Sequence, residues 1–273
     1  MSDLSAKEIF KEFYRRTSKK FGQNFLFNES INKKILSAAG KLDEKIVAEI
    51  GPGPGGLTLE ILKQNIKKLY ILEYDKHWIS VWNELKANFS DELEALEIID
   101  CDALKFDMST IKPQVIISNL PYNISTQLLF KWLPDFDMYE KLILMFQKEV
   151  AERIYANRGT KAYGKLSVLA QWKSQVKKKF DLEPGSFTPP PKVKSTVVEF
   201  VPYSSKEKIE IDFQKFSMFL TDIFAHRRKI VVKPMQKYFR NPTNILEKFG
   251  YSETIRAEDI SVEDYLKIFS LLK

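Results

Sequence analysis

The sequence has few of the residues that would indicate a disulfide-stabilised or metal-binding protein. Its 273 residues include one cysteine, Cys101, and two histidines, His77 and His226. A single cysteine excludes an intramolecular disulfide and is typical of a reducing compartment. Two histidines without a Cys-x-x-Cys pair argue against a zinc site. We therefore expect no bound metal, and a core that needs no covalent cross-link at this chain length.

Long hydrophobic runs are also missing. No stretch of about 18 apolar residues occurs, so we expect no membrane span. The N-terminal segment lacks the apolar region of a signal peptide. Hydrophobic residues make up 44% of the chain and charged residues 29%, which is ordinary for a globular protein. These features predict a soluble, cytoplasmic protein, and no pattern indicates an obligate dimer, so we expect a monomer.

Acidic residues are outnumbered by basic ones, 36 against 43, which gives a net charge of +7. The surplus lies at the two ends: residues 1–24 hold six bases and three acids, and residues 174–273 hold 18 bases and 13 acids. Two basic clusters, at 173–179 and 227–240, could bind phosphate groups of a nucleic acid. A solvated lysine-rich face has the same composition, so the basic clusters alone do not show that the protein binds a nucleic acid.

Apolar runs alternate with helical patterns between about residues 30 and 157. The runs that predict buried strands are Ile46 to Ile50, Leu69 to Leu72, Leu96 to Ile99, Val115 to Ser118 and Leu142 to Phe146. Helical spacing predicts helices at 78–89, at 124–133 and after Ser30, which we expect to cap a helix that ends at Gly40. Strands that alternate with helices and are apolar on both faces predict a parallel sheet between helical layers.

The pattern changes after residue 186. The segment 187–191 reads Phe-Thr-Pro-Pro-Pro, which excludes a helix or a central strand. A strand is predicted at 196–201, and helical spacing begins at Phe213. We therefore predict three parts: a basic arm at 1–18, an α/β domain at 19–203 and a small all-α domain at 204–273.

A glycine-rich loop follows the first predicted strand. Gly51, Gly53 and Gly56 match G-x-G-x-x-G, and a helix is predicted from Leu57. Glu73 ends the next strand, 22 positions after Gly51, where a carboxylate would accept the hydroxyls of a nucleoside ribose. This pattern alone also suits a nicotinamide dinucleotide.

Two further acids favour a different cofactor. Glu49 precedes the loop, where its charge would repel a pyrophosphate but suits the cationic S-adenosylmethionine (SAM). Asp102 follows a third strand and could accept a hydrogen bond from the adenine amino group. Each acid alone could be a solvated strand-end carboxylate, but three in register with a glycine loop favour SAM.

The tetrapeptide Asn119-Leu-Pro-Tyr122 follows another predicted strand, at the edge where α/β sheets place their sites. An exocyclic aromatic amine is a weak nucleophile because its lone pair is delocalised into the ring. Acceptors from the Asn119 side chain and the Leu120 or Pro121 carbonyl would make its nitrogen pyramidal, and Tyr122 would stack on the base. In isolation the tetrapeptide also suits a simple turn.

Six motifs in order resemble the KsgA/RsmA family of rRNA adenine dimethyltransferases. They are KKFGQNFL (19–26), EIGPGPGGLT (49–58), NLPYNIS (119–125), LMFQKEV (144–150), KAYGKLSVLAQ (161–171) and FTPPPKV (187–193). The resemblance implies a Rossmann-like SAM-dependent methyltransferase domain with a small all-α C-terminal domain that binds RNA. It also implies dimethylation of N6 on two adjacent adenines near the 3′ end of 16S rRNA in the small ribosomal subunit, a step in ribosome biogenesis.

The same resemblance implies roles for individual residues. Those expected at the cofactor are Asn24 with the neighbouring Gln23, Leu26, Gly51, Glu73, Asp102 with Ala103, and Asn119. Asn119, Pro121 and Tyr122 would also hold the target adenine, and Phe187 would cover its other face. Because a stacked base is out of reach, the adenine must be extruded or single-stranded.

One departure and three alternatives bear on this interpretation. Family members carry asparagine where Lys233 stands, and Pro234 should interrupt the basic helix that begins near residue 225.

The alternative functions are an Erm-type 23S rRNA methyltransferase, a non-enzymatic nucleic-acid binder descended from this family, and a NAD oxidoreductase. The intact loop and tetrapeptide argue against the non-enzymatic binder, and a NAD oxidoreductase would leave the tetrapeptide without a function.

Overall fold

The computed structural model describes residues 6–13, 24–204, 211–225 and 229–272. Most of the predicted arm at 1–18, together with Gln23, His226 and residues 227–228 of the basic cluster, lies outside these ranges. The chain divides into two compact units. One comprises Met1–Ala151 and Lys177–Pro202, the other Glu152–Val176 and Tyr203–Lys273.

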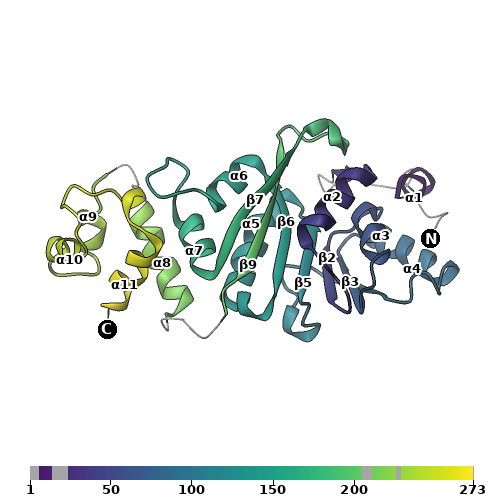
Figure 1. The fold of residues 1–273 in the computed structure, drawn as a ribbon, viewed down its shortest axis with the longest axis horizontal. Helices are drawn as coiled ribbons and strands as arrows, with labels where there is room; N and C mark the ends of the chain where they lie inside the picture. The colour runs from purple at the N-terminus through teal and green to yellow at the C-terminus, as the bar shows by residue number, and fades with distance from the viewer. Residues whose placement is uncertain (1–5, 14–23, 205–210, 226–228, 273) are drawn as a thin grey trace. The chain divides into compact units, whose positions relative to one another are not determined.

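A seven-stranded sheet forms the centre of the first unit (Figure 1). Its strands in spatial order are β4 (Leu96–Asp100), β3 (Lys68–Glu73), β2 (Ile46–Ile50), β5 (Val115–Asn119), β6 (Lys141–Gln147), β9 (Ser195–Pro202) and β7 (Ser174–Leu182). The first five are parallel, and β9 is antiparallel to β6. All six predicted strands are confirmed within two residues at each end. β7 was not predicted because three consecutive exposed lysines interrupt its pattern, as suits an edge strand.

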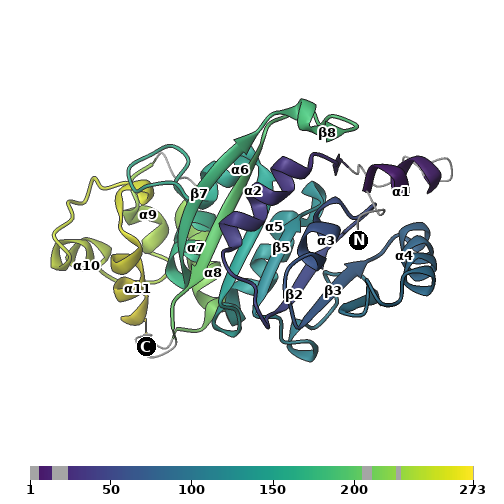
Figure 2. The ribbon, with the colours of Figure 1, turned by 45° about the vertical axis from the view of Figure 1, so that its right-hand side comes forward.

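Helices cover both faces of this sheet. On one face lie α2 (Glu29–Ala39), α3 (Gly56–Leu62) and α4 (Lys76–Asn88), whose apolar side chains share one core cluster with alternate strand residues. Figure 2 shows α2 lying over the strands. On the other face α5 (Tyr122–Trp132) packs against β6, and Phe136 and Phe146 both pack edge-on against Phe200. Burial on both faces explains the continuous apolar runs.

The start of α2 corrects one prediction. Asn28, not Ser30, is the N-cap, because its side chain accepts a hydrogen bond of 3.2 Å from the backbone N–H of Ile31. Ser30 therefore lies inside the first turn. Gly40 ends the helix with φ +79°, as predicted.

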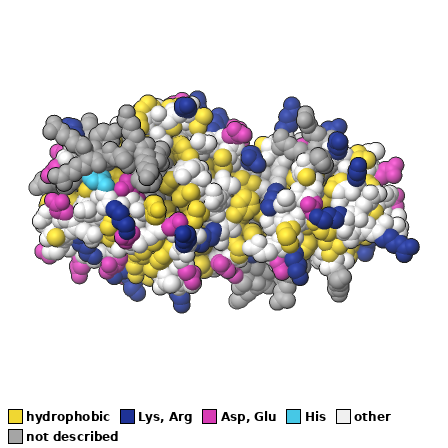
Figure 3. All heavy atoms as spheres, turned by 180° about the vertical axis from the view of Figure 1, so that it is seen from behind, with side chains coloured by type: hydrophobic (Ala, Val, Ile, Leu, Met, Phe, Trp, Pro, Cys, Tyr) yellow, Lys and Arg dark blue, Asp and Glu magenta, His cyan; other side chains and the backbone are white. Residues whose placement is uncertain are grey.

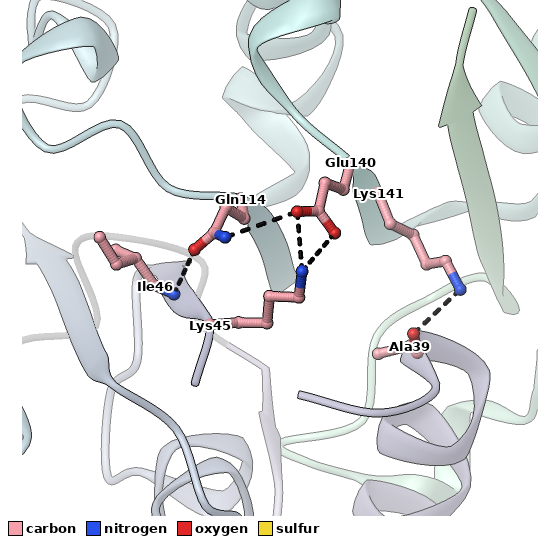
Figure 4. A network of polar contacts seen from close by, with 6 residues as sticks. All are labelled: Ala39, Lys45, Ile46, Gln114, Glu140 and Lys141. Carbon is pink, nitrogen blue, oxygen red and sulfur yellow. Dashed lines mark hydrogen bonds and ion pairs between the residues drawn. The ribbon is translucent and has the colours of Figure 1, made fainter. Parts of the chain in front are cut away.

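A polar network joins the amino ends of the central strands (Figure 4). Gln114 accepts a hydrogen bond of 2.8 Å from the backbone N–H of Ile46, and Lys45 pairs with Glu140 at 2.7 Å. Lys141 donates to the last carbonyl of α2, that of Ala39, at 3.0 Å. These contacts align β2, β5 and β6 at one edge, so the opposite, carboxyl edge carries the loops that follow each strand.

A two-stranded sheet lies outside the main one. β1 (Phe25–Leu26) pairs antiparallel with β8 (Phe187–Thr188). The Phe-Thr-Pro-Pro-Pro segment is thus neither helix nor central strand, as its prolines require. The pairing holds two segments together that are far apart in the sequence.

The second unit is helical. Besides the end of α6 (Lys148–Ile154) it contains α7 (Lys165–Lys173), α8 (Phe213–Phe224), α9 (Val232–Met235), α10 (Pro242–Lys248) and α11 (Val262–Ser270). Residues 152–176, which we predicted within the α/β domain, group here instead. The reason is that Trp172 of α7 stacks on Phe213 at 5.9 Å and meets Phe216 edge-on at 5.1 Å.

Among the described ranges, no helix is long and apolar enough to cross a membrane.

Basic side chains on the surface lie among side chains of other kinds. Figure 3 shows lysine and arginine side chains spread over one face among acidic and apolar ones. In the basic cluster at 173–179, Lys178 pairs with Asp181 at 2.8 Å and Lys179 pairs with Glu199 at 3.2 Å. The basic cluster at 173–179 is therefore partly neutralised.

Candidate active site

The site lies where β2 and β5 are neighbours, the point at which the strand order reverses. Chain connections lead from β2 toward β3 on one side, while β5 lies on the other, which opens a crevice beyond the strand ends. The ladder between them runs through Val47/Val115 and Ala48/Ile116. Beyond it the Ser118 hydroxyl donates to the Ile50 carbonyl at 2.8 Å, which keeps the two strand ends together beneath the crevice.

A cavity of about 390 Å³ occupies this crevice. It is lined by eight of the nine residues expected to bind the cofactor directly or to hold the target base: Asn24, Leu26, Gly51, Glu73, Asp102, Asn119, Pro121 and Tyr122. Glu49, Ala103 and Leu120, which were expected beside them, also line it. The eight come from five segments of the chain: the segment at Asn24 to Leu26, and the ends of four parallel strands that the topology brings to one edge. The ninth, Phe187, is not among the lining residues.

The glycine loop brings two chain segments into close contact. Gly51 has φ +66°, and a Cβ atom there would lie 3.4 Å from Cγ of Pro121. Gly53 has φ +53°, and its carbonyl accepts a hydrogen bond of 2.8 Å from the indole N–H of Trp82. Glycine allows this left-handed backbone, so the loop lies directly against the Asn-Leu-Pro-Tyr turn.

Glu49 is a buried acid at the base of the cavity. It is 2% exposed and accepts a hydrogen bond of 2.7 Å from the hydroxyl of Thr58. Burial, opposed by this hydrogen bond and reinforced by the nearby charge of Glu73, raises the pKa of Glu49 to about 8. A positively charged ligand group beside it would favour the ionised form.

Glu73 is held in place by backbone amides. One of its carboxyl oxygens accepts from the N–H groups of Tyr74 and Asp75, both at 2.9 Å, and the other lies 3.4 Å from the N–H of Gly53. Burial raises the pKa of Glu73, and these amides partly oppose that effect. The carboxylate is therefore oriented by the strand end and the glycine loop before any ligand binds.

Asp102 belongs to a rigid turn. Its side chain accepts a hydrogen bond of 2.9 Å from the N–H of Leu104. Lys131 of α5 donates to the carbonyls of Ala103, at 3.0 Å, and Phe106. Burial lowers the pKa of this lysine. The helix that follows the tetrapeptide thus fixes the turn that lines the expected adenine end.

Asn119 links the tetrapeptide to the N-terminal wall of the cavity. Its side-chain N–H donates to the backbone carbonyl of Asn24 at 3.1 Å. This bond uses one of the two N–H groups of the carboxamide and identifies its other end as the oxygen, which is an acceptor. The arrangement suits the expected contact with an amine.

Tyr122 is fixed at its hydroxyl. It begins α5, and its hydroxyl lies 2.5 Å from that of Ser195, which is fully buried. Burial raises the pKa of Tyr122, so it stays neutral at physiological pH. A ring held at both ends offers a preformed stacking surface.

Phe187 lies outside this assembly. It is 3% exposed and belongs to the core cluster, and its backbone pairs with Leu26. It shares this core cluster with Leu26, and it is not among the residues that line the cavity.

Sequence reasoning missed several lining residues, among them Asn32 and Tyr74. Tyr74 directly follows Glu73 and is 62% exposed. Asn32 lies on the buried face of α2, where a polar residue spaced with Ile35 and Ala39 was the signal that could have found it. Cys101 also lines the cavity, and burial with the charge of Asp102 raises the pKa of its thiol to about 11, so it stays protonated.

The chemistry of these residues fits SAM. Two buried carboxylates suit a ligand that carries positive charge, and the buried side-chain oxygen of Asn32 has no hydrogen-bond partner among the described residues. Both features call for donors from a ligand. No cluster of three or more potential metal ligands occurs in the described parts of the chain.

The fold and site together define a Rossmann-like methyltransferase. A dimethyladenosine transferase from Plasmodium falciparum has a similar structure, with a TM-score of 0.77 and 29% identity over 90% of this chain and 96% of that one. The 23S rRNA methyltransferase ErmE gives a TM-score of 0.66 over 91% of this chain and 99% of its own. At 19% identity that likeness is one of fold alone.

Sequence comparison narrows the class to a family. Residues 14–273 match the family described as ribosomal RNA adenine dimethylase. The ribosomal RNA small subunit methyltransferase A of Agrobacterium fabrum is 41% identical, over 97% of this chain and 96% of that protein. The protein of the same name from Pelagibacter ubique is 39% identical, over 93% and 95%. The chain therefore belongs to the ribosomal RNA adenine dimethylase family and is a SAM-dependent rRNA adenine dimethyltransferase, which confirms the predicted fold class, activity and cofactor.

Proposed function

We propose that the protein dimethylates N6 of two adjacent adenines near the 3′ end of 16S rRNA, within the small ribosomal subunit. Relatives 35–41% identical over almost their whole length carry the name small subunit methyltransferase, which supports this choice of RNA. We further propose that it acts in the cytoplasm, as a monomer, during ribosome biogenesis. Its basic C-terminal unit would contact RNA phosphates.

In the proposed complex, each wall of the cavity would contact one part of SAM. Glu73 would accept the ribose hydroxyls, and Asp102 the adenine amino group. The segment from Asn24 to Leu26 and the loop at Gly51 would enclose the methionine part. Bound SAM supplies an electrophilic methyl group on its sulfonium sulfur. The remaining task of the protein is to place an amine in line with that group.

The observation that carries the proposal is the hydrogen bond from Asn119 to the Asn24 carbonyl, because it orients the side-chain oxygen as an acceptor. This oxygen and the Leu120 carbonyl would accept the two N–H bonds of the adenine amine and direct its lone pair outward. Tyr122 would stack on the base. Positioning alone suffices, because the methylated ammonium loses its proton readily to water.

The test uses small subunits that lack the modification, incubated with the protein and labelled SAM, followed by mapping of dimethyladenosine. Asn119→Ala should reduce transfer at least about 100-fold, a typical effect of lost transition-state positioning, while SAM affinity changes only a few-fold. Asn83→Ala, on the exposed side of α4, is the matched control and should keep full activity.

Two outcomes would contradict the proposal. Methylation of 23S rRNA instead would favour the Erm-type alternative. Full transfer by the Asn119 variant would remove this residue from the reaction, whatever the RNA.

A further inference from the structure

One polar side chain in the first unit is buried where α2 should be apolar. Asn32 is 1% exposed and shares the inner face of α2 with Ile35, Leu36 and Ala39. A buried carboxamide is tolerated only when its hydrogen-bonding groups are satisfied. Asn32 therefore either destabilises the core or forms a hydrogen bond with a group outside the core.

The carboxamide of Asn32 is only half satisfied. Its N–H group donates to the backbone carbonyl of Leu26 at 3.3 Å. Its oxygen, by contrast, is buried and has no hydrogen-bond partner within the described residues. Native proteins rarely leave a buried acceptor unpaired, so this oxygen calls for a donor.

That oxygen belongs to a residue of the cavity wall. Asn32, Leu26 and Gly56 all line the cavity, and a Cβ on Gly56 would lie 2.1 Å from the Leu26 carbonyl and 3.1 Å from the Asn32 nitrogen. Only glycine at the start of α3 lets Asn32 and Leu26 approach so closely. Glu49, the buried acid, lines the same cavity.

The chemistry of SAM narrows the choice of donor. SAM carries three kinds of N–H or O–H group: the adenine amine, the ribose hydroxyls and the α-ammonium. The first two are assigned to Asp102 and Glu73, and the carboxylate of the methionine part has no protons to donate. The ammonium remains, and its positive charge also suits Glu49.

We propose that the side-chain oxygen of Asn32 accepts a hydrogen bond from the α-ammonium group of SAM. Asn32 is then a cofactor-binding residue that couples the wall at Leu26 to the amino-acid end of the ligand. The inference rests on the cofactor assignment above. It requires that the affinity contributed by Asn32 depend on the ammonium and not on the rest of the ligand.

The experiment compares two ligands by calorimetry: S-adenosylhomocysteine and its deamino analogue, which keeps the carboxylate but lacks the ammonium. Asn32→Leu should weaken binding of the first at least fivefold and change binding of the second less than twofold. Asn32→Ser, whose side chain is too short for the contact, should show the same selectivity if the leucine variant does not fold. Asn83→Ala should affect neither ligand.

Equal losses for both ligands would assign Asn32 a purely structural role and overturn the proposal. Unchanged binding of S-adenosylhomocysteine would do the same, as expected if a water molecule satisfies the oxygen. Wild-type protein that binds neither ligand would instead contradict the cofactor assignment.

Discussion

Replacing Glu49 with glutamine should remove a pH-dependent loss of stability from the ligand-free protein. Glutamine has nearly the same shape, and its oxygen can still accept the hydrogen bond from Thr58. It cannot ionise, however. The variant therefore isolates the cost of charging a buried carboxyl group.

The magnitude follows from the pKa of about 8 in the folded protein against 4.5 for an ordinary glutamate. Below pH 4.5 both the folded and the unfolded chain hold the proton. Between these values the unfolded chain loses it first, so the free energy of unfolding falls as pH rises. The loss is complete above pH 8 and amounts to at most about 5 kcal/mol, with about 3 kcal/mol already lost at pH 7.

Urea denaturation of both proteins without ligand, between about pH 5 and pH 9, provides the assay. The variant should gain stability relative to the wild type steadily as pH rises. Parallel stability curves over the whole range would refute the reasoning, because they would mean that Glu49 ionises in the folded state as easily as in water. Binding of SAM to the wild type near pH 7 should release a proton, measurable by calorimetry in two buffers.

Two further variants test the ribose contact and the glycine loop. Glu73→Gln should weaken SAM binding by about 10- to 150-fold in calorimetry, since a hydrogen bond to a charged acceptor contributes about 1.5–3 kcal/mol; the exposed Glu84→Gln is its control, and an unchanged dissociation constant would argue against the ribose assignment. Gly53→Ala should lower the melting temperature, because alanine resists φ +53° and its Cβ would lie 2.7 Å from a phenylalanine ring. Gly185→Ala, which has open space and ordinary φ, should not, and equal melting temperatures would contradict the strain argument.

The central sheet could be predicted because its strands are buried on both faces. Such strands appear in the sequence as continuous apolar runs, which makes them easy to recognise, as Ile46–Ile50 and Val115–Asn119 illustrate. The edge strand β7 lacked this signal, because solvent on one side permits its lysines. The two-residue pairing of β1 with β8 was beyond prediction, since it depends on tertiary contact and not on local pattern.

The division into units illustrates the same limit. Nothing in the sequence of α7 distinguishes it from helices that cover the sheet. Its grouping depends on what Trp172 meets in space, namely Phe213 and Phe216. Local propensity also misplaced the cap of α2, because serine and asparagine two positions apart are both good caps.

For the site, spacing along the chain was enough to find residues at strand ends. Glu73 and Asn119 end parallel strands and Asp102 follows one, so their convergence at one sheet edge is a matter of topology. Phe187 and Asn32 are placed instead by packing between segments distant in sequence. The prediction for Phe187 came from the family resemblance alone, since no local pattern distinguishes this ring from a core aromatic.

The pairing of β1 with β8 has a consequence for biosynthesis. The wall formed by Asn24, Phe25 and Leu26 is made early, but its strand partner at Phe187 and Thr188 leaves the ribosome more than 160 residues later. Until then a nascent chain can pair β2 with β3 and β5, yet it cannot complete this wall. The β1–β8 pair is therefore completed only late in translation, when most of the central sheet already exists.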